Sequence, residues 1–550
     1  MTVLSLKPRP DPVPEPIDQV EIARRRRHRL MIVLACAALG LTAVAAAGVL
    51  LPLARRQRYF GIVCMGLVYV SALPLVASLI QFAAIGLNRF RIGYERLRPF
   101  YPRVAVVVPA WNEANVIGAT IERLLGMDYP GSNVRVYVVD DASTDGTPDV
   151  VREWAAREPD RVHHLRRQQG GQGKAHTLNH GIAQILSDPW AEAVLIIDAD
   201  VQFEPSALRK MARHLSNPDV GAVTAYIKEG SVGGNYLTRY IAYEYITAQA
   251  AVRRAQNVFG SMVCLAGGAQ LHSRESLMSI GSRIDTSTLA EDTVTTFRTQ
   301  LSGKRVVFEG NAIVWAEEPG DLDGLWKQRL RWARGNVQIS LQCSYMWLRG
   351  QRYGKLGGGM FSLIWFTVVL MPLFTMAAST GLVGLSLIDA PTAWTTFRLL
   401  WIFHTVSFVL STGMSCVIDP ATARRAWVQG LLFPGAISLA IILYSMAPGP
   451  FGTLLESAAH ALGIAMTSPR TDALEFFLYT WLTSSMLVAY AARWLSGRWR
   501  LEVLPRILVQ IAGYGALLSA VTVASYVREI QGAGLAWDKT IKTGKVALPR

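Results

Sequence analysis

The sequence contains few charged residues and few cysteines. Asp, Glu, Lys and Arg make up 17% of its 550 residues, whereas 51% are hydrophobic, so the chain is apolar for a soluble protein. The five cysteines form no Cys-X-X-Cys pair, and Cys36, Cys64 and Cys416 fall within apolar runs, where cysteine usually packs as a small hydrophobe. The cysteine pattern therefore predicts neither a disulfide framework nor a zinc site.

Two common nucleotide-binding fingerprints are also missing. The loops after the predicted strands contain neither Gly-X-Gly-X-X-Gly nor the phosphate loop that ends in Gly-Lys-Ser/Thr, so neither a dehydrogenase nor a P-loop NTPase is supported. The net charge is +15, but much of the excess flanks apolar runs, as in the basic stretch 24–29. This is the cytoplasmic-side bias of membrane proteins, and we expect no nucleic-acid partner.

Long apolar runs lie on both sides of a charged middle segment. At about 20 residues per membrane span, they predict two spans before this segment and about five after it. The predicted spans cover residues 31–53, 60–87, 360–386, 397–418, 427–447, 475–493 and 506–527. Flanking Lys and Arg residues place the N-terminus and the middle segment on the cytoplasmic side of a multi-pass protein of the inner or plasma membrane.

The domain organisation follows from these runs. We expect, in chain order, a disordered Pro-rich basic tail, two transmembrane helices, a folded α/β domain, amphipathic interfacial helices, about five transmembrane helices and a C-terminal tail. The corresponding boundaries are 1–29, 30–88, 89–319, 320–355, 356–528 and 529–550. The interfacial helices are inferred from tryptophan interleaved with arginine after residue 325, a pattern that suits a helix at a membrane surface.

The middle segment alternates strand-like and helix-like patterns. Strands are expected at 104–108, 134–139, 162–165, 194–197, 220–227, 306–308 and 312–316. Helices are expected at 113–125, 148–157, 175–186, 205–215, 235–258 and 325–348, with another that starts near 290. This alternation predicts a mostly parallel, doubly wound α/β sheet. Its central strand, Val194–Ile197, is apolar on both faces, as in a sheet covered by helices on both sides.

Acidic residues follow three of these strands. Glu113 lies after the first strand, Asp141 after the second, and Asp198 and Asp200 after the central one. The carboxyl ends of parallel strands share one edge, where open α/β sheets bind ligands. A nucleotide fits such a cleft, and the Asp-X-Asp pair suits a hard divalent cation that holds a phosphate. A solvated turn after a strand is the alternative for this pair.

Three further patterns contain candidate site residues, each with a structural alternative. The Gly-rich segment before Lys174 lets the backbone approach a phosphate, or is a flexible loop. Asp292 is a candidate general base, although acids in a first helical turn also favour the helix dipole. Gln328 and Trp332 share a helical face that could grip an acceptor, with Arg331 near a diphosphate. Alternatively, this segment anchors the helix to lipid headgroups.

Four motifs, in this order, resemble those of the membrane-embedded family 2 glycosyltransferases, which include cellulose, chitin, hyaluronan and poly-N-acetylglucosamine synthases. They are Asp-Asp-Ala-Ser-Thr-Asp-Gly-Thr at 140–147, Asp-Ala-Asp at 198–200, Glu-Asp-Thr at 291–293 and Gln-X-X-Arg-Trp at 328–332. The resemblance implies a GT-A fold and inverting transfer from a nucleotide sugar, usually UDP-linked. The segment 267–276 does not closely match cellulose or hyaluronan synthases, so the sugar stays open.

The resemblance also implies residue roles. The residues implied to contact the nucleotide are Glu113, Asp141, Lys174 and Asp198. Those implied to bind Mg²⁺ or Mn²⁺ are Asp198 and Asp200, and Asp292 would be the catalytic base. The residues implied to hold the acceptor and the diphosphate are Gln328, Arg331 and Trp332.

The function expected from this resemblance is an inverting, processive glycosyltransferase that polymerises a sugar and passes the polysaccharide across the membrane. One alternative is a single addition to a lipid or lipid-linked acceptor. An alternative of another class is a non-catalytic nucleotide-binding transporter or scaffold, which the intact Asp198, Asp200 and Asp292 disfavour. Expected partners are the nucleotide sugar, a growing polysaccharide or lipid acceptor, membrane lipids and accessory export subunits.

Overall fold

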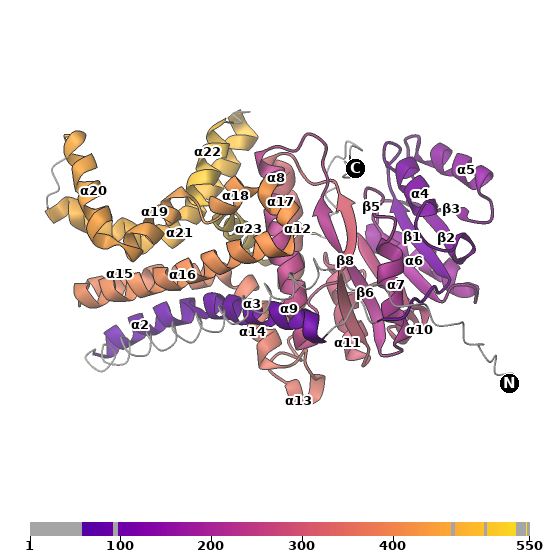
Figure 1. Ribbon diagram of the computed structural model, residues 1–550, viewed down its shortest axis with the longest axis horizontal. Coiled ribbons are helices and arrows are strands. Elements are labelled where there is room, and N and C mark those ends of the chain that lie inside the picture. The colour runs from indigo at the N-terminus through magenta and orange to yellow at the C-terminus, as the bar shows by residue number, and fades with distance from the viewer. Residues whose placement is uncertain (1–57, 92–96, 464–467, 500–502, 535–545, 547–550) are drawn as a thin grey trace, which may run out of the picture.

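The computed structural model describes residues 58–91, 97–463, 468–499, 503–534 and 546. The predicted N-terminal tail and the first predicted span, 31–53, lie outside the described residues. The described chain forms a sheet domain and a block of helices, with the long helix α12 (Leu322–Gln342) between them (Figure 1).

An eight-stranded sheet lies at the centre of the folded domain, within the described part of the chain, in the order β3-β2-β1-β4-β7-β6-β8-β5. The strands are β1 (Val104–Ala110), β2 (Val134–Asp140), β3 (Val162–Arg166), β4 (Ala193–Ile197), β5 (Gln202–Phe203), β6 (Val220–Glu229), β7 (Ala269–Ser273) and β8 (Arg305–Ala316). The strands β1 to β4 pair in parallel, as the sequence predicts.

Helices cover both faces of this sheet. They are α4 (Ile117–Leu125), α5 (Thr147–Arg157), α6 (Lys174–Ser187), α7 (Ala207–Ala212), α10 (Arg274–Ser279) and α11 (Glu291–Leu301). Alternate residues of β1 enter opposite cores, because Val106 and Val108 cluster with α4 residues whereas Val107 clusters with α6 residues. Burial on both faces accounts for the uninterrupted apolar run of this strand.

The sheet is mixed rather than mostly parallel, which corrects the prediction. Strand β7 runs antiparallel between β4 and β6, and β5 is antiparallel to β8, so the described strands make four parallel and three antiparallel pairings. The sequence does not predict β7 because Ala-Gln-Leu-His-Ser has no apolar run. Its buried Gln270 and His272 side chains are 3.1 Å apart and hydrogen-bond to each other, which satisfies polar groups inside the sheet.

The segment expected as one helix over 235–258 changes its pitch midway. Helices α8 (Tyr236–Glu244) and α9 (Val252–Phe259) are joined by a π-helical stretch, η4 (Tyr245–Ala251). The Asn235 side chain caps α8 by accepting from two backbone N–H groups. A π-helical stretch rotates the side chains that follow it and is frequent at functional sites.

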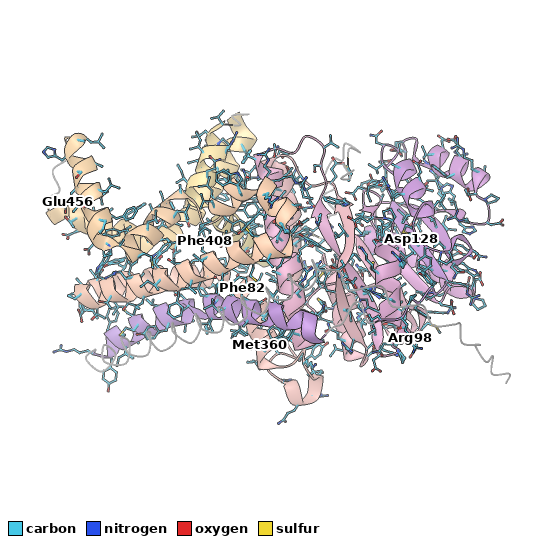
Figure 2. All side chains as sticks on the ribbon, in the orientation of Figure 1. Phe82, Arg98, Asp128, Met360, Phe408 and Glu456 are labelled. Carbon is cyan, nitrogen blue, oxygen red and sulfur yellow. The ribbon has the colours of Figure 1, made fainter. Side chains whose placement is uncertain are left out.

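The helical block surrounds α12 on the side away from the sheet. Its helices are α2 (Tyr59–Ser71), α3 (Leu73–Arg91), α13 (Gly350–Tyr353), α14 (Gly359–Val369), α15 (Met371–Ser386), α16 (Ala390–Ile418), α17 (Pro420–Arg425), α18 (Trp427–Leu431), α19 (Ala436–Met446), α20 (Pro448–Ala461), α21 (Ser468–Trp499), α22 (Val503–Ala512) and α23 (Tyr514–Ile530). Figure 2 shows Phe82 and Phe408 within this block, while Asp128 and Arg98 lie on the sheet domain.

Two described segments are long and apolar enough to cross a membrane, Tyr59–Leu87 and Ala390–Ile418. The pairs α14–α15 and α22–α23 are bent by 77° and 97°, so up to four spans result if each pair counts as one. These criteria concern length and composition, and the count of about seven spans stays a prediction.

Candidate active site

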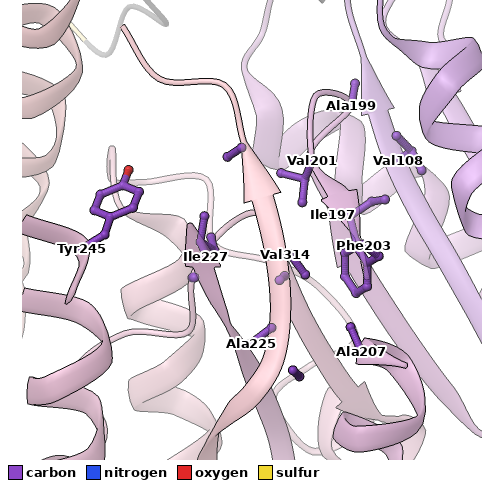
Figure 3. Close-up of a cluster of buried hydrophobic side chains, with 14 of the residues drawn as sticks. Val108, Ile197, Ala199, Val201, Phe203, Ala207, Ala225, Ile227, Tyr245 and Val314 are labelled. Carbon is purple, nitrogen blue, oxygen red and sulfur yellow. The ribbon is translucent and has the colours of Figure 1, made fainter. Parts of the chain in front are cut away.

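A cavity of about 430 Å³ lies at the carboxyl ends of β1 and β4, between the sheet and α12. The predicted site residues that line it are Glu113, Lys174, Asp198, Asp200, Asp292, Gln328, Arg331 and Trp332. Figure 3 shows Ala199 and Val201 on the sheet side and Tyr245 on the helix opposite, three residues that also line the cavity. The fold thus brings together loops that are more than 200 residues apart in the chain.

Lys174 and Asp198 form an ion pair inside this cavity. The Lys174 ammonium also donates to the Gly267 carbonyl at 3.3 Å. Burial alone would lower the pKa of Lys174, but the carboxylates of Asp198, Glu291 and Asp292 outweigh it and raise that pKa. Lys174 is therefore positively charged at the start of α6, where it can offset the charge of a phosphate.

Asp198 and Asp200 offer carboxylate oxygens to a hard cation such as Mg²⁺ or Mn²⁺, because both follow β4 and both line the cavity. The described residues include no group of three or more His, Cys, Asp and Glu side chains arranged for a metal. Two carboxylates fit a cation that takes its other oxygen ligands from a diphosphate and water, the usual arrangement for Mg²⁺ at phosphates. The residues present therefore fit the predicted metal when a donor is bound.

Asp292 lies in the first turn of α11 and accepts a hydrogen bond from the Thr293 N–H at 2.8 Å. It faces Gly267, where an added Cβ would lie 3.3 Å from Asp292 Oδ2 and 3.4 Å from Lys174 Nζ. The lack of a side chain at Gly267 leaves space between the candidate base and the candidate phosphate ligand.

The charge of Asp292 contributes to raised pKa values of two neighbouring side chains, Glu291 and Cys264. Burial and Asp292 raise the pKa of Glu291, although Lys174 and Arg331 oppose the shift. Burial raises the pKa of the Cys264 thiol well above its usual range, and Asp292 adds to this effect. Glu291 is thus biased toward its protonated form and Cys264 stays a neutral thiol beside the candidate base.

Hydrogen bonds tie the loop after β1 to the loop after β2. The Asn112 N–H donates to Ser143 Oγ and the Thr144 N–H donates to Asn112 Oδ1, both at 2.9 Å. The Glu113 N–H donates to Thr147 Oγ1 at 2.8 Å. Asn112 adopts a left-handed φ of 54°, a conformation that asparagine tolerates better than most residues. These bonds fix Glu113 at the cavity edge.

Asp141 is the predicted site residue that the cavity does not include. Its carboxylate pairs with Arg167 and accepts a hydrogen bond from the Gly171 N–H at 2.8 Å. The side chain is almost fully buried. In this structure Asp141 holds the Gly-rich segment that precedes α6, and its contact with a nucleotide stays a prediction.

Helix α12 presents Gln328, Arg331 and Trp332 to the cavity, as their spacing predicts. The same helix buries Trp326 and Arg334. The Arg334 guanidinium pairs with Glu529 of α23 at 2.6 Å. These tryptophan and arginine side chains therefore pack against protein, whereas the sequence pattern places them at a membrane surface.

The cavity contains acidic and polar residues that the sequence does not single out. They come from α8, η4 and the segment after β8, and are Glu244, Tyr245, Gln249, Glu317 and Glu318. Glu317 and Glu318 follow a strand, as the other acidic site residues do, and that position could have identified them. Glu244 and Tyr245 have no such signal, because they lie within a helical segment, at the junction of α8 and the π-helical stretch η4.

The fold and the cavity define an α/β domain that places two strand-end carboxylates, a lysine and a third carboxylate around one substrate-sized space. Residues 102–335 match the family described as "Glycosyltransferase like family 2". This match covers less than half of the 550-residue chain, and it includes the strands and the α12 residues that line the cavity.

Two curated relatives show the range of the family. A beta-monoglucosyldiacylglycerol synthase from Synechocystis sp. is 31% identical over 255 residues, which cover 46% of this chain and 52% of that protein. A poly-beta-1,6-N-acetyl-D-glucosamine synthase from Staphylococcus aureus is 26% identical over 275 residues, which cover 49% of this chain and 63% of that protein. The chain thus spans little more than half the length of these relatives.

The solved structures that match this chain include a mannosyltransferase from Pyrobaculum calidifontis in complex with GDP-Man and Mn²⁺. It is 23% identical with a TM-score of 0.45, and the match covers 66% of this chain and 98% of that chain.

Proposed function

We propose that this protein transfers a glycosyl group from a nucleotide diphosphate sugar, of the UDP type, to an acceptor hydroxyl held against α12. The observation that supports this most is that one cavity contains the Asp198–Asp200 pair, Asp292 and Trp332. Trp332 offers an apolar ring face to a sugar. The family 2 glycosyltransferase domain at 102–335 agrees with this chemistry.

Asp292 is the proposed general base. It takes the proton of the acceptor hydroxyl, whose oxygen attacks the anomeric carbon of the donor sugar. The new carbon–oxygen bond forms as the bond to the diphosphate breaks, and the electron pair leaves with the nucleoside diphosphate. This single displacement inverts the anomeric carbon. Because the diphosphate leaves without protonation, the two-carboxylate scheme of glycoside hydrolases is not needed.

The remaining predicted residues are proposed to bind the donor. Lys174, Asp198 and Asp200 lie where its diphosphate would bind, and Glu113 and Asp141 belong to the loops nearest the nucleoside. When bound to Asp198 and Asp200, Mg²⁺ or Mn²⁺ supplies charge stabilisation to the departing diphosphate. The ion pair with Lys174 holds Asp198 at this position, while Arg331 is proposed to contact the diphosphate from α12.

We further propose that the helical block lies in the cell membrane, with the sheet domain on its cytoplasmic side, and exports a growing polysaccharide. The apolar segments Tyr59–Leu87 and Ala390–Ile418 support the membrane placement, and the poly-N-acetylglucosamine synthase among the relatives supports polymerisation. The glycolipid synthase among the relatives supports a second candidate, a single addition to a lipid acceptor. Lipids and export subunits are the proposed partners.

Product analysis tests the proposed function. The purified protein in lipid nanodiscs receives UDP-glucose, UDP-N-acetylglucosamine or UDP-glucuronate, each with Mg²⁺, with Mn²⁺ or with a chelator. UDP release and product size are measured together. We expect one donor to yield high-molecular-weight product, and we expect chelation to abolish it.

The other outcomes separate the candidates. A product with one added sugar on lipid replaces polymerisation with single addition. Undiminished turnover in the chelator contradicts the proposed metal site. The absence of UDP release from all three donors contradicts the proposed UDP-sugar donor.

A further inference from the structure

A buried polar network surrounds Arg329, a residue next to those predicted to grip the acceptor. Arg329 is 4% exposed, and its guanidinium donates to Glu244 Oε2 at 2.6 Å. The nearby carboxylate of Glu244 and the ring hydroxyls around it outweigh the effect of burial and raise the pKa of Arg329. The guanidinium is therefore a permanent charge inside the protein, held by a specific carboxylate.

Arg329 contacts both side chains that α12 presents to the acceptor end of the cavity. One of its nitrogens donates to Gln328 Oε1, and its guanidinium carbon lies 4.2 Å from the ring centroid of Trp332. The Nε2 group of the Gln328 amide donates to Glu318 Oε2 at 3.1 Å. The orientations of Gln328 and Trp332 thus depend on Arg329.

The network continues from Arg329 into the helical block. Glu244 Oε2 also accepts a hydrogen bond from the Tyr514 hydroxyl at 2.8 Å. Tyr514 is the first residue of α23, directly after the 97° bend from α22, and it is fully buried. Its ring stacks on Tyr240 with centroids 5.4 Å apart. Tyr514 does not line the cavity, and its hydroxyl connects to the acceptor site through Glu244 and Arg329.

We propose that Arg329 is a positioning residue for acceptor binding, and that Tyr514 and Glu244 connect it to the helical block. This rests on the proposed function, because Gln328 and Trp332 are the proposed acceptor contacts. A planar guanidinium is required, since the point charge of a lysine cannot bond Glu244 and Gln328 while it stacks on Trp332.

The test variant is Tyr514→Phe, which removes one hydroxyl and keeps the stacked ring. Tyr526→Phe is the matched control, because Tyr526 lies on the same helix and its hydroxyl donates to the Val369 carbonyl. The kinetics use the UDP-sugar that turns over in the donor panel. The acceptor probe is a glucose pentamer, an N-acetylglucosamine pentamer or dioleoylglycerol in phosphatidylcholine vesicles, whichever receives sugar.

We expect Tyr514→Phe to raise the acceptor KM by about three- to tenfold, on the order of one hydrogen bond to a charged group. The donor KM should stay within about twofold, and the control should change neither constant beyond this margin. Arg329→Lys should raise the acceptor KM further, again with little effect on the donor KM. Melting temperatures of all variants show whether each one folds.

A double-mutant comparison separates positioning from general stability. In a Gln328→Ala background the Tyr514→Phe change should raise the acceptor KM by a smaller factor, because one of the two side chains that Arg329 orients is absent. The proposal is overturned if Tyr514→Phe raises the acceptor KM by the same factor with and without Gln328→Ala. It is also overturned if the Tyr514→Phe and Arg329→Lys proteins fold and have the acceptor KM of the original protein. An unmodified protein that turns over no donor overturns the proposed function instead, and this inference with it.

Discussion

Asp292 faces the space beside Gly267, while Lys174 reaches that space from the opposite side. Base and phosphate ligand are therefore separate side chains on separate elements, α11 and α6. Asp292 contributes less to the raised pKa of Lys174 than Asp198 and Glu291 do, so a change at Asp292 should leave Lys174 charged. This separation allows catalysis and donor binding to be tested independently.

Asp292→Asn should reduce the transfer rate by about 10²- to 10⁴-fold, because the amide cannot accept the acceptor proton. UDP binding, measured by calorimetry with Mn²⁺, should change little. The control is Glu275→Gln, which alters a carboxylate that is 71% exposed and pairs with Lys304 outside the cavity. Full transfer activity in Asp292→Asn would remove this residue from the mechanism.

His272 makes the stability of the sheet depend on pH. It is fully buried in β7, and burial lowers its pKa from 6.5 to about 4. Between these values the unfolded chain binds a proton that the folded sheet does not, so acid favours unfolding across that window. The contribution reaches about 2 kcal/mol at pH 5.

His272→Gln should flatten this dependence. Thermal unfolding is measured in detergent at pH 7.5 and pH 5. The melting temperature should fall less between these pH values for the variant than for the unmodified protein, whatever the stability of the variant at pH 7.5. An identical loss in both proteins would mean that another group titrates in this range.

At the scale of elements, the sequence predicts β1 and β4 from continuous apolar runs. It predicts β2 and β3 from shorter apolar stretches that Arg135, His163 and His164 interrupt. It does not predict β7, because Gln270 and His272, which hydrogen-bond to each other inside the sheet, interrupt the hydrophobic pattern. The sequence predicts the part of the cavity edge that β1, β4 and α12 form, from the acidic residues that follow β1 and β4 and from the four-residue spacing of Gln328 and Trp332 in α12. The sequence does not predict the part of the cavity edge that η4 forms, since the pitch of the helix changes at Tyr245, which lines the cavity.

In the segment between α9 and β7, Gly267 approaches the site with no side chain of its own. Gly267→Ala should reduce kcat/KM by roughly tenfold or more, because the added methyl occupies space between Asp292 and Lys174 and displaces the bound donor. Gly515→Ala is the matched control, since an added Cβ there meets nothing within 4 Å. Equal activity of both variants would show that no substrate group passes close to Gly267.

At the scale of the whole molecule, one buried ion pair joins the sheet to the helical block. Lys228 at the end of β6 lies 2.8 Å from Asp419 Oδ2, and their side chains are 13% and 4% exposed. The Tyr226 hydroxyl donates to the same oxygen at 3.2 Å. Asp419 also caps α17 by accepting from Thr422. The two parts of the molecule thus share one carboxylate.

Asp419→Asn should destabilise the protein by roughly 3–5 kcal/mol, because it leaves the Lys228 charge buried and unpaired. Asp149→Asn removes an exposed pair with Arg152 and should cost at most about 1 kcal/mol. Thermal unfolding in nanodiscs compares the two variants. Equal melting temperatures would show that this junction does not hold the two parts together.

The contacts of α12 also fix an order of events during synthesis. Glu244 and Arg334 belong to the first 335 residues, but their partners Tyr514 and Glu529 lie in α23. The ribosome therefore synthesises the strands and loops that carry Lys174, Asp198 and Asp292 before it synthesises α23, the helix that contacts α12. These strands and loops are thus synthesised while α12 still lacks its contacts with α23, and these contacts form only after α23 has been made.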